Sequence, residues 1–311
     1  MADFWSDYWR SLKPRDVEEP IDVWVHRPLA YVLAKLAYPT PITPNQITAV
    51  SMLFGVFAGL ALLSLSRFGL IMAGLCVFLS AVFDCADGQL ARMRRTSSPL
   101  GRILDGMADL VVIVGAVRGS IWFLWNKYSG TWWVGVLVVL VSGLTAWTGS
   151  FHTSMYDHYK NVFLRLTHEH YQDSEDLGEA ERRYANRPLN EGWLEKLSWV
   201  VIFYYLRSQE KFALWYDPYT SARLTRLPRY SAERAEIYRR LAGPAMAWWR
   251  RWFGFGSLVF GLAVSIGFGV VEWYAVARVV LLNAVFFLYL RPMQQEASRR
   301  AWQEMGEGPH D

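Results

Sequence analysis

Four aspartates stand in two close pairs within a largely apolar part of the chain. Asp84 and Asp87 are three residues apart, and Asp105 and Asp109 are four apart, so on helices each pair would share one face. Carboxylates gathered at the edge of a low-dielectric phase repel one another and require cations. Oxygen ligands at this density suit Mg²⁺ or Mn²⁺, which proteins often hold with carboxylates and substrate phosphates together. The two pairs therefore predict a divalent-metal site that acts on phosphate.

Small and basic residues around the first pair extend this pattern. Gly88 follows Asp84 by one helical turn and Ala91 follows Asp87 by one turn, which leaves that face bare for close approach of a phosphate or a helix. Arg92 can bind phosphate oxygens with a forked pair of hydrogen bonds. Metal-binding carboxylates, a phosphate-binding arginine and bare backbone together indicate a phosphoryl-transfer site.

The complete spacing of residues 84–109 is D-x2-D-G-x2-A-R-x8-G-x3-D-x3-D, and it resembles the signature of the CDP-alcohol phosphotransferase (CDP-alcohol phosphatidyltransferase) family. A second family-like feature is the run Thr43-Pro-Asn-Gln-Ile-Thr48 at the mouth of the first apolar stretch. The resemblance implies an enzyme that transfers a phosphate-linked alcohol from a CDP carrier to an acceptor hydroxyl and releases CMP. Motifs with this many fixed positions are far more specific than short ones.

The resemblance also implies roles for individual residues. Asp84, Asp87 and Asp105 would bind two divalent ions, Mg²⁺ or Mn²⁺, and Asp109 would take the proton of the acceptor hydroxyl and touch a metal as well. The catalytic pair would thus be Asp105 and Asp109. The residues implied to hold the CDP donor are Asn45, Thr48, Gly88, Arg92 and Ser98. A homodimer is a further expectation from the resemblance.

The surrounding sequence predicts that membrane helices position these residues. Of the 311 residues 53% are hydrophobic and only 19% charged. The charges are segregated, since residues 50–83 and 252–277 carry almost none and residues 157–251 are rich in lysine and arginine. A helix that crosses a membrane needs about 20 mostly apolar residues. Six stretches meet this requirement: 46–66, 69–90, 103–126, 131–154, 249–269 and 271–291.

The placement of lysine and arginine predicts the orientation of these spans. Residues 1–45, the turn at 92–102 and the stretch 157–251 are rich in basic residues, whereas the opposite side has only Arg67 and Lys127. Because cytoplasmic loops carry the excess of positive charge, both termini and the aspartate-rich turn are expected to face the cytoplasm. No cleavable signal-peptide pattern is expected at the start of the sequence.

The predicted fold is therefore an all-α integral membrane protein with four parts. Residues 1–43 form a cytoplasmic N-terminal segment with an interfacial helix at 20–38, and residues 44–154 form spans one to four with the catalytic motif. Residues 155–248 form a helical cytoplasmic insertion with a helix near 191–211, and residues 249–311 hold the last two spans and a tail. Basic residues in the insertion favour anionic lipid over nucleic acid as a partner. Cys76 and Cys85 lie within one apolar stretch, which excludes a disulfide framework.

Three functions remain open from the sequence. In the first, CDP-diacylglycerol is the donor and a small polar alcohol such as glycerol phosphate, inositol phosphate or serine is the acceptor, in phospholipid biosynthesis. In the second, a CDP-linked amino alcohol or polyol is the donor and a lipid such as diacylglycerol, or a polyol, accepts. The basic turn near Asp105 favours an acidic acceptor and hence the first. An ion transporter would explain the intramembrane carboxylates but not Gly88, Ala91 and Arg92 at their spacing.

Overall fold

The computed structural model describes residues 2–12, 14–94, 96, 99–128, 130–169, 177–187, 192–221 and 230–306, without the side chains of residues 2–4, 99–105, 177–179, 183, 194–195, 198 and 221. The described residues form helices and no strand, so the predicted all-α class is confirmed. The chain divides into two compact units, which are described separately below. Unit 1 comprises Met1–Ser150 and Arg250–Asn283, and unit 2 comprises Phe151–Trp249 and Ala284–Asp311.

Six helical stretches are long and apolar enough to cross a membrane, which confirms the six predicted spans and an integral, multi-pass membrane protein. Their bounds are Pro44–Leu62, Arg67–Arg94, Gly106–Lys127, Trp132–Thr167, Ala232–Phe268 and Val271–Glu304. The fourth stretch ends later than the predicted residue 154, and the fifth begins earlier than the predicted residue 249. Both differences arise because backbone hydrogen bonding continues a helix through charged residues after the apolar window has ended.

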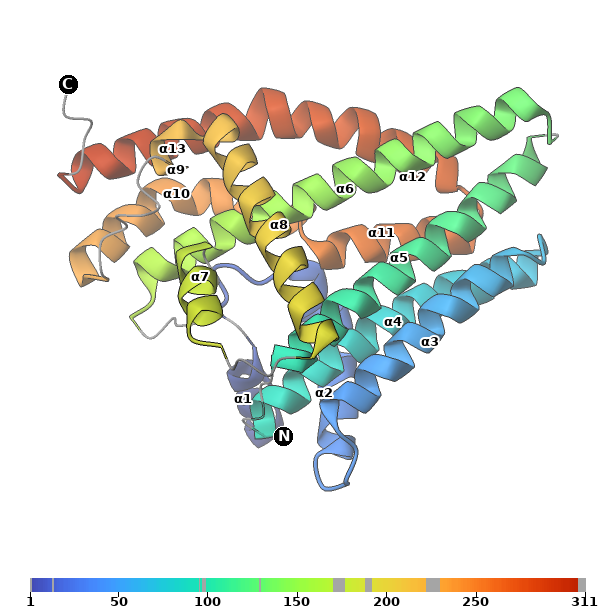
Figure 1. The fold of residues 1–311 in the computed structure, drawn as a ribbon, viewed down its shortest axis with the longest axis horizontal. Helices are drawn as coiled ribbons and strands as arrows, with labels where there is room; N and C mark the ends of the chain where they lie inside the picture. Colours follow the sequence, from blue (N-terminus) through green and yellow to red (C-terminus); the bar gives the residue numbers. More distant parts are fainter. Residues whose placement is uncertain are drawn as a thin grey trace. The chain divides into compact units, whose positions relative to one another are not determined.

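Three helices of unit 1, α3 (Pro44–Leu62), α4 (Arg67–Arg94) and α5 (Pro99–Lys127), pack side by side (Figure 1). Glycines bring α3 and α5 into backbone contact. A Cβ placed on Gly55 would lie 2.8 Å from the Cα of Val112, and one on Gly115 would lie 2.6 Å from the carbonyl oxygen of Gly55. Contacts of Gly59 with Gly115 follow those of Gly55 with Val112 in the same chain direction, so α3 and α5 run parallel.

Helix α4 is enclosed by two further helices of unit 1. Helix α11 (Phe255–Phe268) approaches it so closely that a Cβ on Gly74 would lie 2.6 Å from the carbonyl oxygen of Ala263. On another face, α2 (Arg27–Ala37) packs through its small side chains. The apolar cluster there consists of Ala30, Ala34, Ala37, Ile47, Val82, Ala86 and Leu90. The helix that carries the first aspartate pair is therefore held firmly from several sides.

The N-terminal part of unit 1 contains α1 (Ala2–Ser11) and the π-helical turn η1 (Asp22–His26), which leads directly into α2. The predicted helix over residues 20–38 is thus present. Its outward face exposes large apolar side chains, among them Trp24 at 70% and Leu36 at 67%. An exposed apolar face next to a polar one is typical of a helix that lies in a membrane interface.

Unit 1 also contains α12 (Val271–Val276) and the π-helical segment η3 (Ala277–Leu282), which holds a buried arginine. Arg278 is only 3% exposed, and its Nη1 donates a 3.4 Å hydrogen bond to the carbonyl oxygen of Trp252. That carbonyl belongs to the last residue of α10 (Ala232–Trp252), where carbonyl groups lack partners within the helix. A cation is favourable at this end of a helix. This contact gives the intramembrane arginine a structural role.

Unit 2 is built from residues 151–167 of α6 (Trp132–Thr167), α7 (Leu177–Ala185), α8 (Trp193–Tyr216), α9 (Pro218–Ser221), most of α10, η4 (Val285–Leu290) and α13 (Arg291–Glu304). Its core is aromatic, with Tyr159, Tyr216, Tyr238, Trp249, Phe286 and Trp302 almost fully buried. The buried carboxylate of Asp217 accepts hydrogen bonds from the Ser298 hydroxyl (2.5 Å) and the Tyr219 amide (3.0 Å). The helix predicted near residues 191–211 is present as α8.

Candidate active site at the start of α3 and the end of α4

The first aspartate pair lies in the C-terminal half of α4, and α3 supplies a direct partner. The hydroxyl of Thr48 donates a 2.5 Å hydrogen bond to Oδ2 of Asp87. Both residues are buried, with Thr48 exposed by 4% and Asp87 by 5%. Asp84, one turn earlier on α4, is partly exposed. The structure thus brings together a residue predicted to hold the donor and a residue predicted to bind metal.

The first turn of α3 is fixed by a capping box. The side chain of Thr43 accepts from the amide of Gln46 (3.3 Å), and the side chain of Gln46 accepts from the amide of Thr43 (2.9 Å). Pro44 follows at the first helical position, where its lack of an N–H costs nothing. This local chemistry begins the helix at Pro44 and places Asn45 in its first turn, one turn before Thr48.

Arg94 holds the connection between α2 and α3 that leads into this cap. Its guanidinium donates hydrogen bonds to four backbone carbonyl oxygens of that connection, at 2.5–2.9 Å. The four carbonyls belong to Ala37, Tyr38, Thr40 and Ile42. The fork of an arginine can satisfy several acceptors at once, which explains why this position is an arginine. Its described contacts serve the turn.

A hydrogen bond between two buried serines fixes how α4 is aligned along α3. The hydroxyls of Ser51 and Ser80 lie 2.9 Å apart. Asp84 follows Ser80 by about one helical turn and Asp87 by about two, while Thr48 precedes Ser51 by about one turn. Because α3 and α4 run in opposite directions, these steps all lead toward the same end of the helix pair.

The contact between α3 and α5 places the second aspartate pair at this end as well. Gly55 meets Val112, and the two helices are parallel. Thr48 precedes Gly55 on α3 by about two helical turns, and Asp105 precedes Val112 on α5 by the same distance. Asp109 precedes Val112 by about one turn. The backbone therefore brings both aspartate pairs to one end of the α3–α4–α5 bundle.

The expected metal ligands lie only partly within the described side chains. The side chain of Asp105 and the whole of Ser98 are outside the described residues. Among the side chains that the structure describes, no three from His, Cys, Asp and Glu are close enough to hold one metal ion. The donor set of four carboxylates at one end of the bundle nevertheless fits a hard divalent cation such as Mg²⁺ or Mn²⁺, which prefers oxygen ligands.

Gly88 and Arg92 lie next to each other on the accessible part of α4. Arg92 is exposed, and its Nη1 lies 3.5 Å from the place that a Cβ on Gly88 would take. Apart from the backbone of the same helix, this is the one described heavy atom within 4 Å of that place. The guanidinium thus lies back over the bare backbone of Gly88, toward the aspartates. An arginine in this position can donate its terminal N–H groups to phosphate oxygens.

The N-terminal segment contributes contacts that sequence reasoning missed. Nε2 of Gln89 donates to the hydroxyl of Ser11 (3.2 Å), and Nε of Arg92 donates to the carbonyl oxygen of Ser11 (3.0 Å). Ser11 precedes the motif by more than seventy residues. The second of these bonds uses a backbone acceptor, so no residue type at position 11 could have signalled it.

Comparison with known proteins supports the resemblance read from the motif. The sequence model of the family described as CDP-alcohol phosphatidyltransferase matches residues 41–161. This stretch contains the capped start of α3, all four aspartates and the whole of α5. It extends the agreement beyond the motif itself, into α6.

Curated relatives match about a quarter to a third of the chain. A phosphatidylinositol phosphate synthase from Corynebacterium glutamicum is 39% identical over 98 residues, which are 31% of this chain and 43% of the relative. The synthase of the same name from Mycobacteroides abscessus is 31% identical over 108 residues, 34% of this chain and 46% of the relative. A bifunctional IPC transferase and DIPP synthase from Rubrobacter xylanophilus is 36% identical over 85 residues, 26% and 19% of the two chains. The matched part spans less than half the length of each relative.

The segment that the family model matches includes the spacing of the four aspartates and the bundle that gathers them. Residues 41–161 match the sequence model of the CDP-alcohol phosphatidyltransferase family, and the predicted resemblance is confirmed for this segment.

Proposed function

We propose that this protein is a membrane CDP-alcohol phosphotransferase of phospholipid biosynthesis that transfers a phosphatidyl group from CDP-diacylglycerol to an acceptor hydroxyl, with release of CMP. The observation that carries this proposal is the gathering of Thr48, Asp87 and the second aspartate pair at one end of the α3–α4–α5 bundle. The active site would face the cytoplasm, as the distribution of lysine and arginine predicts.

The acceptor that we favour is a phosphorylated polyol of the inositol phosphate type. Two of the relatives are named phosphatidylinositol phosphate synthase, and such a product contains a phosphorylated inositol. The basic turn after α4 is consistent with an acceptor that brings negative charge, because arginine pairs well with phosphate.

The proposed roles of the residues follow from the kind of charge each can supply. The hydroxyl of the acceptor gives its proton to the carboxylate of Asp109, and its oxygen attacks the phosphorus remote from cytidine. The bond between that phosphorus and the bridging oxygen breaks, and the oxygen leaves with CMP. Arg92 neutralises phosphate oxygens of the donor, and Thr48 orients the carboxylate of Asp87. The donor site comprises Asn45, Thr48, Gly88, Arg92 and Ser98.

We assign two divalent ions, Mg²⁺ or Mn²⁺, to the carboxylates of Asp84, Asp87, Asp105 and Asp109. When bound, such ions supply positive charge that stabilises a phosphoryl group during transfer. A homodimer is also proposed, from the family resemblance. Apart from the backbone of its own helix, nothing described lies within 4 Å of the place of a Cβ on Gly143 of α6, and a small residue of this kind permits close approach of another helix.

Release of CMP by purified protein tests the proposed reaction. The donors are CDP-diacylglycerol, CDP-choline and CDP-ethanolamine, and each is paired with inositol phosphate, glycerol phosphate, serine and diacylglycerol in the presence of Mg²⁺ or Mn²⁺. We expect release from CDP-diacylglycerol with inositol phosphate. Release from CDP-choline or CDP-ethanolamine with diacylglycerol alone would instead favour the aminoalcohol reaction. A protein that releases CMP from none of these pairs would contradict the proposal.

Asp109→Asn tests the proposed base. A positioned general base typically contributes about 10²–10⁴-fold to a rate, so turnover should fall by this order while CDP still binds. Glu296→Gln is the matched control, because Glu296 pairs with Arg299 and Arg300 on α13 in unit 2, outside the proposed site. Full activity of Asp109→Asn would exclude Asp109 as the base.

A further inference from the structure

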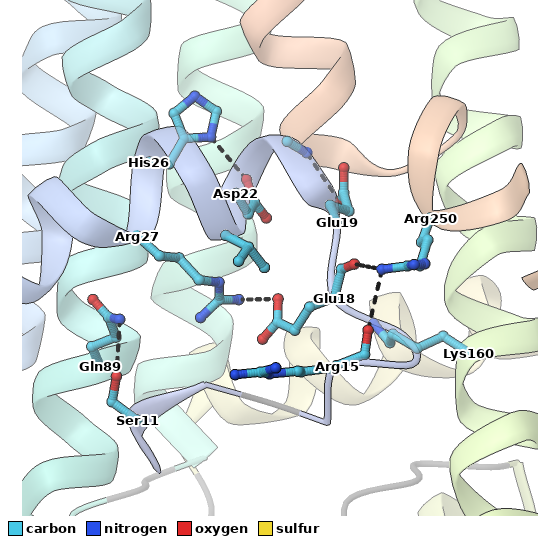
Figure 2. A network of polar contacts seen from close by, with 12 residues as sticks. Ser11, Arg15, Glu18, Glu19, Asp22, His26, Arg27, Gln89, Lys160 and Arg250 are labelled. Carbon is cyan, nitrogen blue, oxygen red and sulfur yellow. Dashed lines mark hydrogen bonds and ion pairs between the residues drawn. The ribbon is translucent and has the colours of Figure 1, made fainter. Parts of the chain in front are cut away.

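The first part of the chain meets the catalytic motif at Ser11, and from here on the N-terminal segment means the described residues 5–12 and 14–27. Ser11 is the last residue of α1 and is buried against α4. Its hydroxyl donates to the carbonyl oxygen of Tyr8 (2.7 Å) and accepts from Nε2 of Gln89 (3.2 Å). Figure 2 shows Gln89 pointing at Ser11 from α4. Gln89 is completely buried, so this hydrogen bond fixes the end of α1 against the motif.

The carbonyl group of Ser11 binds the phosphate-binding arginine of the motif. Nε of Arg92 donates to it at 3.0 Å. The last carbonyl groups of a helix lack partners within the helix and carry partial negative charge, so a guanidinium is favoured there. The hydrogen bond uses only Nε, and the two terminal nitrogens make no hydrogen bond to another described residue. The outer edge of the guanidinium is therefore open above Gly88.

The N-terminal segment is held in place independently of Arg92. The hydroxyl of Tyr8 donates to the carbonyl oxygen of Val23 (2.5 Å), which ties α1 to η1. Glu18 and Arg27 form a buried ion pair at 3.1 Å (Figure 2). Arg250 donates to the backbone carbonyl oxygens of Arg15 and Glu18, both at 3.2 Å. These contacts give the carbonyl group of Ser11 a defined position.

Glu19 fastens the same segment to another helix. Its carboxyl group accepts hydrogen bonds from the amide of Gly256 (3.2 Å) and from both the amide (2.9 Å) and the hydroxyl (3.1 Å) of Ser257. These amides belong to the first turn of α11, where N–H groups lack partners within the helix. The N-terminal segment thus links α11 to the functional end of α4.

We propose that the N-terminal segment positions Arg92 for the donor, with Ser11 and Gln89 as positioning residues that hold its guanidinium at Nε and direct its terminal nitrogens to the pyrophosphate of the CDP group. The inference rests on the proposed function. An arginine side chain loses considerable rotamer freedom when it binds a ligand. A side chain that is already ordered loses less, so the hydrogen bonds to Ser11 should strengthen donor binding.

Kinetics of Gln89→Met test this role. Methionine has a similar shape and cannot donate to Ser11, so the KM for the CDP donor should rise about fivefold, which is the order expected from one lost ordering hydrogen bond, and kcat should stay within about twofold. Ser11→Ala should give the same result, and Ser11→Thr, which keeps the hydroxyl, should restore the wild-type KM. Ser265→Ala is the control, because its hydroxyl serves only α11 within the described contacts.

The double variant Gln89→Met with Arg92→Lys distinguishes positioning from a general loss of structure. Lysine has no Nε–H to bind Ser11, so the KM of the double variant should equal that of Arg92→Lys alone within about twofold. The inference would be overturned if the increases in KM of the two single variants multiplied in the double variant. A wild-type KM in Gln89→Met would also overturn it.

Affinity for CDP itself, measured on the same variants, separates this inference from the proposed reaction. Wild-type protein that binds CDP and releases no CMP contradicts the reaction, and the positioning role is then decided by CDP affinity. In that case the role is supported by a CDP affinity that falls in Gln89→Met and is the same in the double variant as in Arg92→Lys alone. An unchanged CDP affinity in Gln89→Met refutes the role, and so do losses of affinity that multiply in the double variant. Wild-type protein that does not bind CDP refutes both the positioning role and the proposed reaction.

Discussion

Gly115 on α5 and Gly88 on α4 lie in neighbouring helices of unit 1, but they are glycines for different reasons. A Cβ on Gly115 would lie 2.6 Å from the carbonyl oxygen of Gly55, so the packing of two helices excludes any side chain there. Outside the backbone of its own helix, a Cβ on Gly88 would be near only Nη1 of Arg92 among the described atoms, at an ordinary contact distance of 3.5 Å. Packing within the described protein does not require Gly88, and we attribute it to the approach of the CDP donor.

Gly88→Leu should separate activity from stability most strongly. Glycine costs about 1 kcal/mol relative to good helix formers, and leucine is one of these, so thermal stability in detergent should stay the same or rise. A side chain that displaces the donor by about 1 Å can cost about 100-fold in rate, so CMP release should fall by at least this order. Retained activity would show that the bare face of Gly88 does not receive the donor.

Gly115→Ala should have the opposite effect. The new methyl group meets backbone, which cannot move aside locally, and overpacking of this kind typically costs about 1–3 kcal/mol. The melting temperature in detergent should therefore fall. Gly243→Ala on α10 is the control, since nothing outside the backbone of its own helix lies within 4 Å of a Cβ there among the described atoms, and stability should stay unchanged or improve. Equal melting temperatures for the two variants would contradict the proposed distinction between the glycines.

Arg92 and Arg94 also differ in what their side chains are open to bind. The terminal nitrogens of Arg92 make no hydrogen bond to another described residue, whereas the guanidinium of Arg94 donates to four carbonyl oxygens. In Arg94→Lys the ammonium group cannot reach all four carbonyls, and the loss of two hydrogen bonds should cost about 1–3 kcal/mol. Hydrogen exchange should become faster at the amides of residues 42–47, and the KM for the donor should change little. Unchanged exchange in this segment would mean that the capping box at Thr43 holds the turn without Arg94.

Gly254 is a glycine for a third reason, because the carboxyl group of Glu19 occupies the space beside it. The contribution of Glu19 to stability is expected to depend on pH. A Cβ on Gly254 would lie 2.0 Å from Cδ of Glu19, so the carboxyl group fills that space. Burial, and then the charge of Asp22, raise the pKa of Glu19 from 4.5 to about 8, although hydrogen bonds from Ser257 and Gly256 oppose the rise. The folded protein therefore binds this proton more tightly than the unfolded chain does.

Because the folded pKa is the higher one, the contribution of Glu19 to stability is complete below pH 4.5 and is lost as the pH rises toward 8. The melting temperature of Glu19→Gln should lack this part of the decline between pH 5 and pH 8. Identical pH profiles for the variant and the wild-type protein would show that Glu19 does not titrate in this range.

Much of the fold and of the site can be predicted from the sequence, because both depend on residue type and spacing. Apolar length indicates six spans, and the spacing of the aspartates indicates the family and the helix faces. The run at residues 43–48 fits the structure, where Thr43 caps α3. Thr48 and Asp105 lie at the same height along the parallel helices α3 and α5. Side chains with a chemical signature are therefore recognisable from residue type and spacing alone.

The remaining features depend on backbone atoms that no residue type encodes. Arg94 lies in the basic turn at residues 92–102, which the sequence associates with the cytoplasmic side and an acidic acceptor, but its guanidinium binds four carbonyl oxygens of the α2–α3 connection. Arg92 meets the carbonyl oxygen of Ser11, far away in the sequence. The ends of the spans differ from prediction for a similar reason, since helices α6 and α10 continue past their apolar windows through backbone hydrogen bonds.

The most direct test of the account compares metal-dependent CMP release from CDP-diacylglycerol and inositol phosphate by wild-type protein, Asp105→Asn and Glu296→Gln. We expect the wild-type protein and Glu296→Gln to release CMP only with Mg²⁺ or Mn²⁺, and Asp105→Asn to release almost none while it remains folded. Release by Asp105→Asn at the wild-type rate, or release by the wild-type protein without divalent metal, would contradict the proposed metal-dependent reaction.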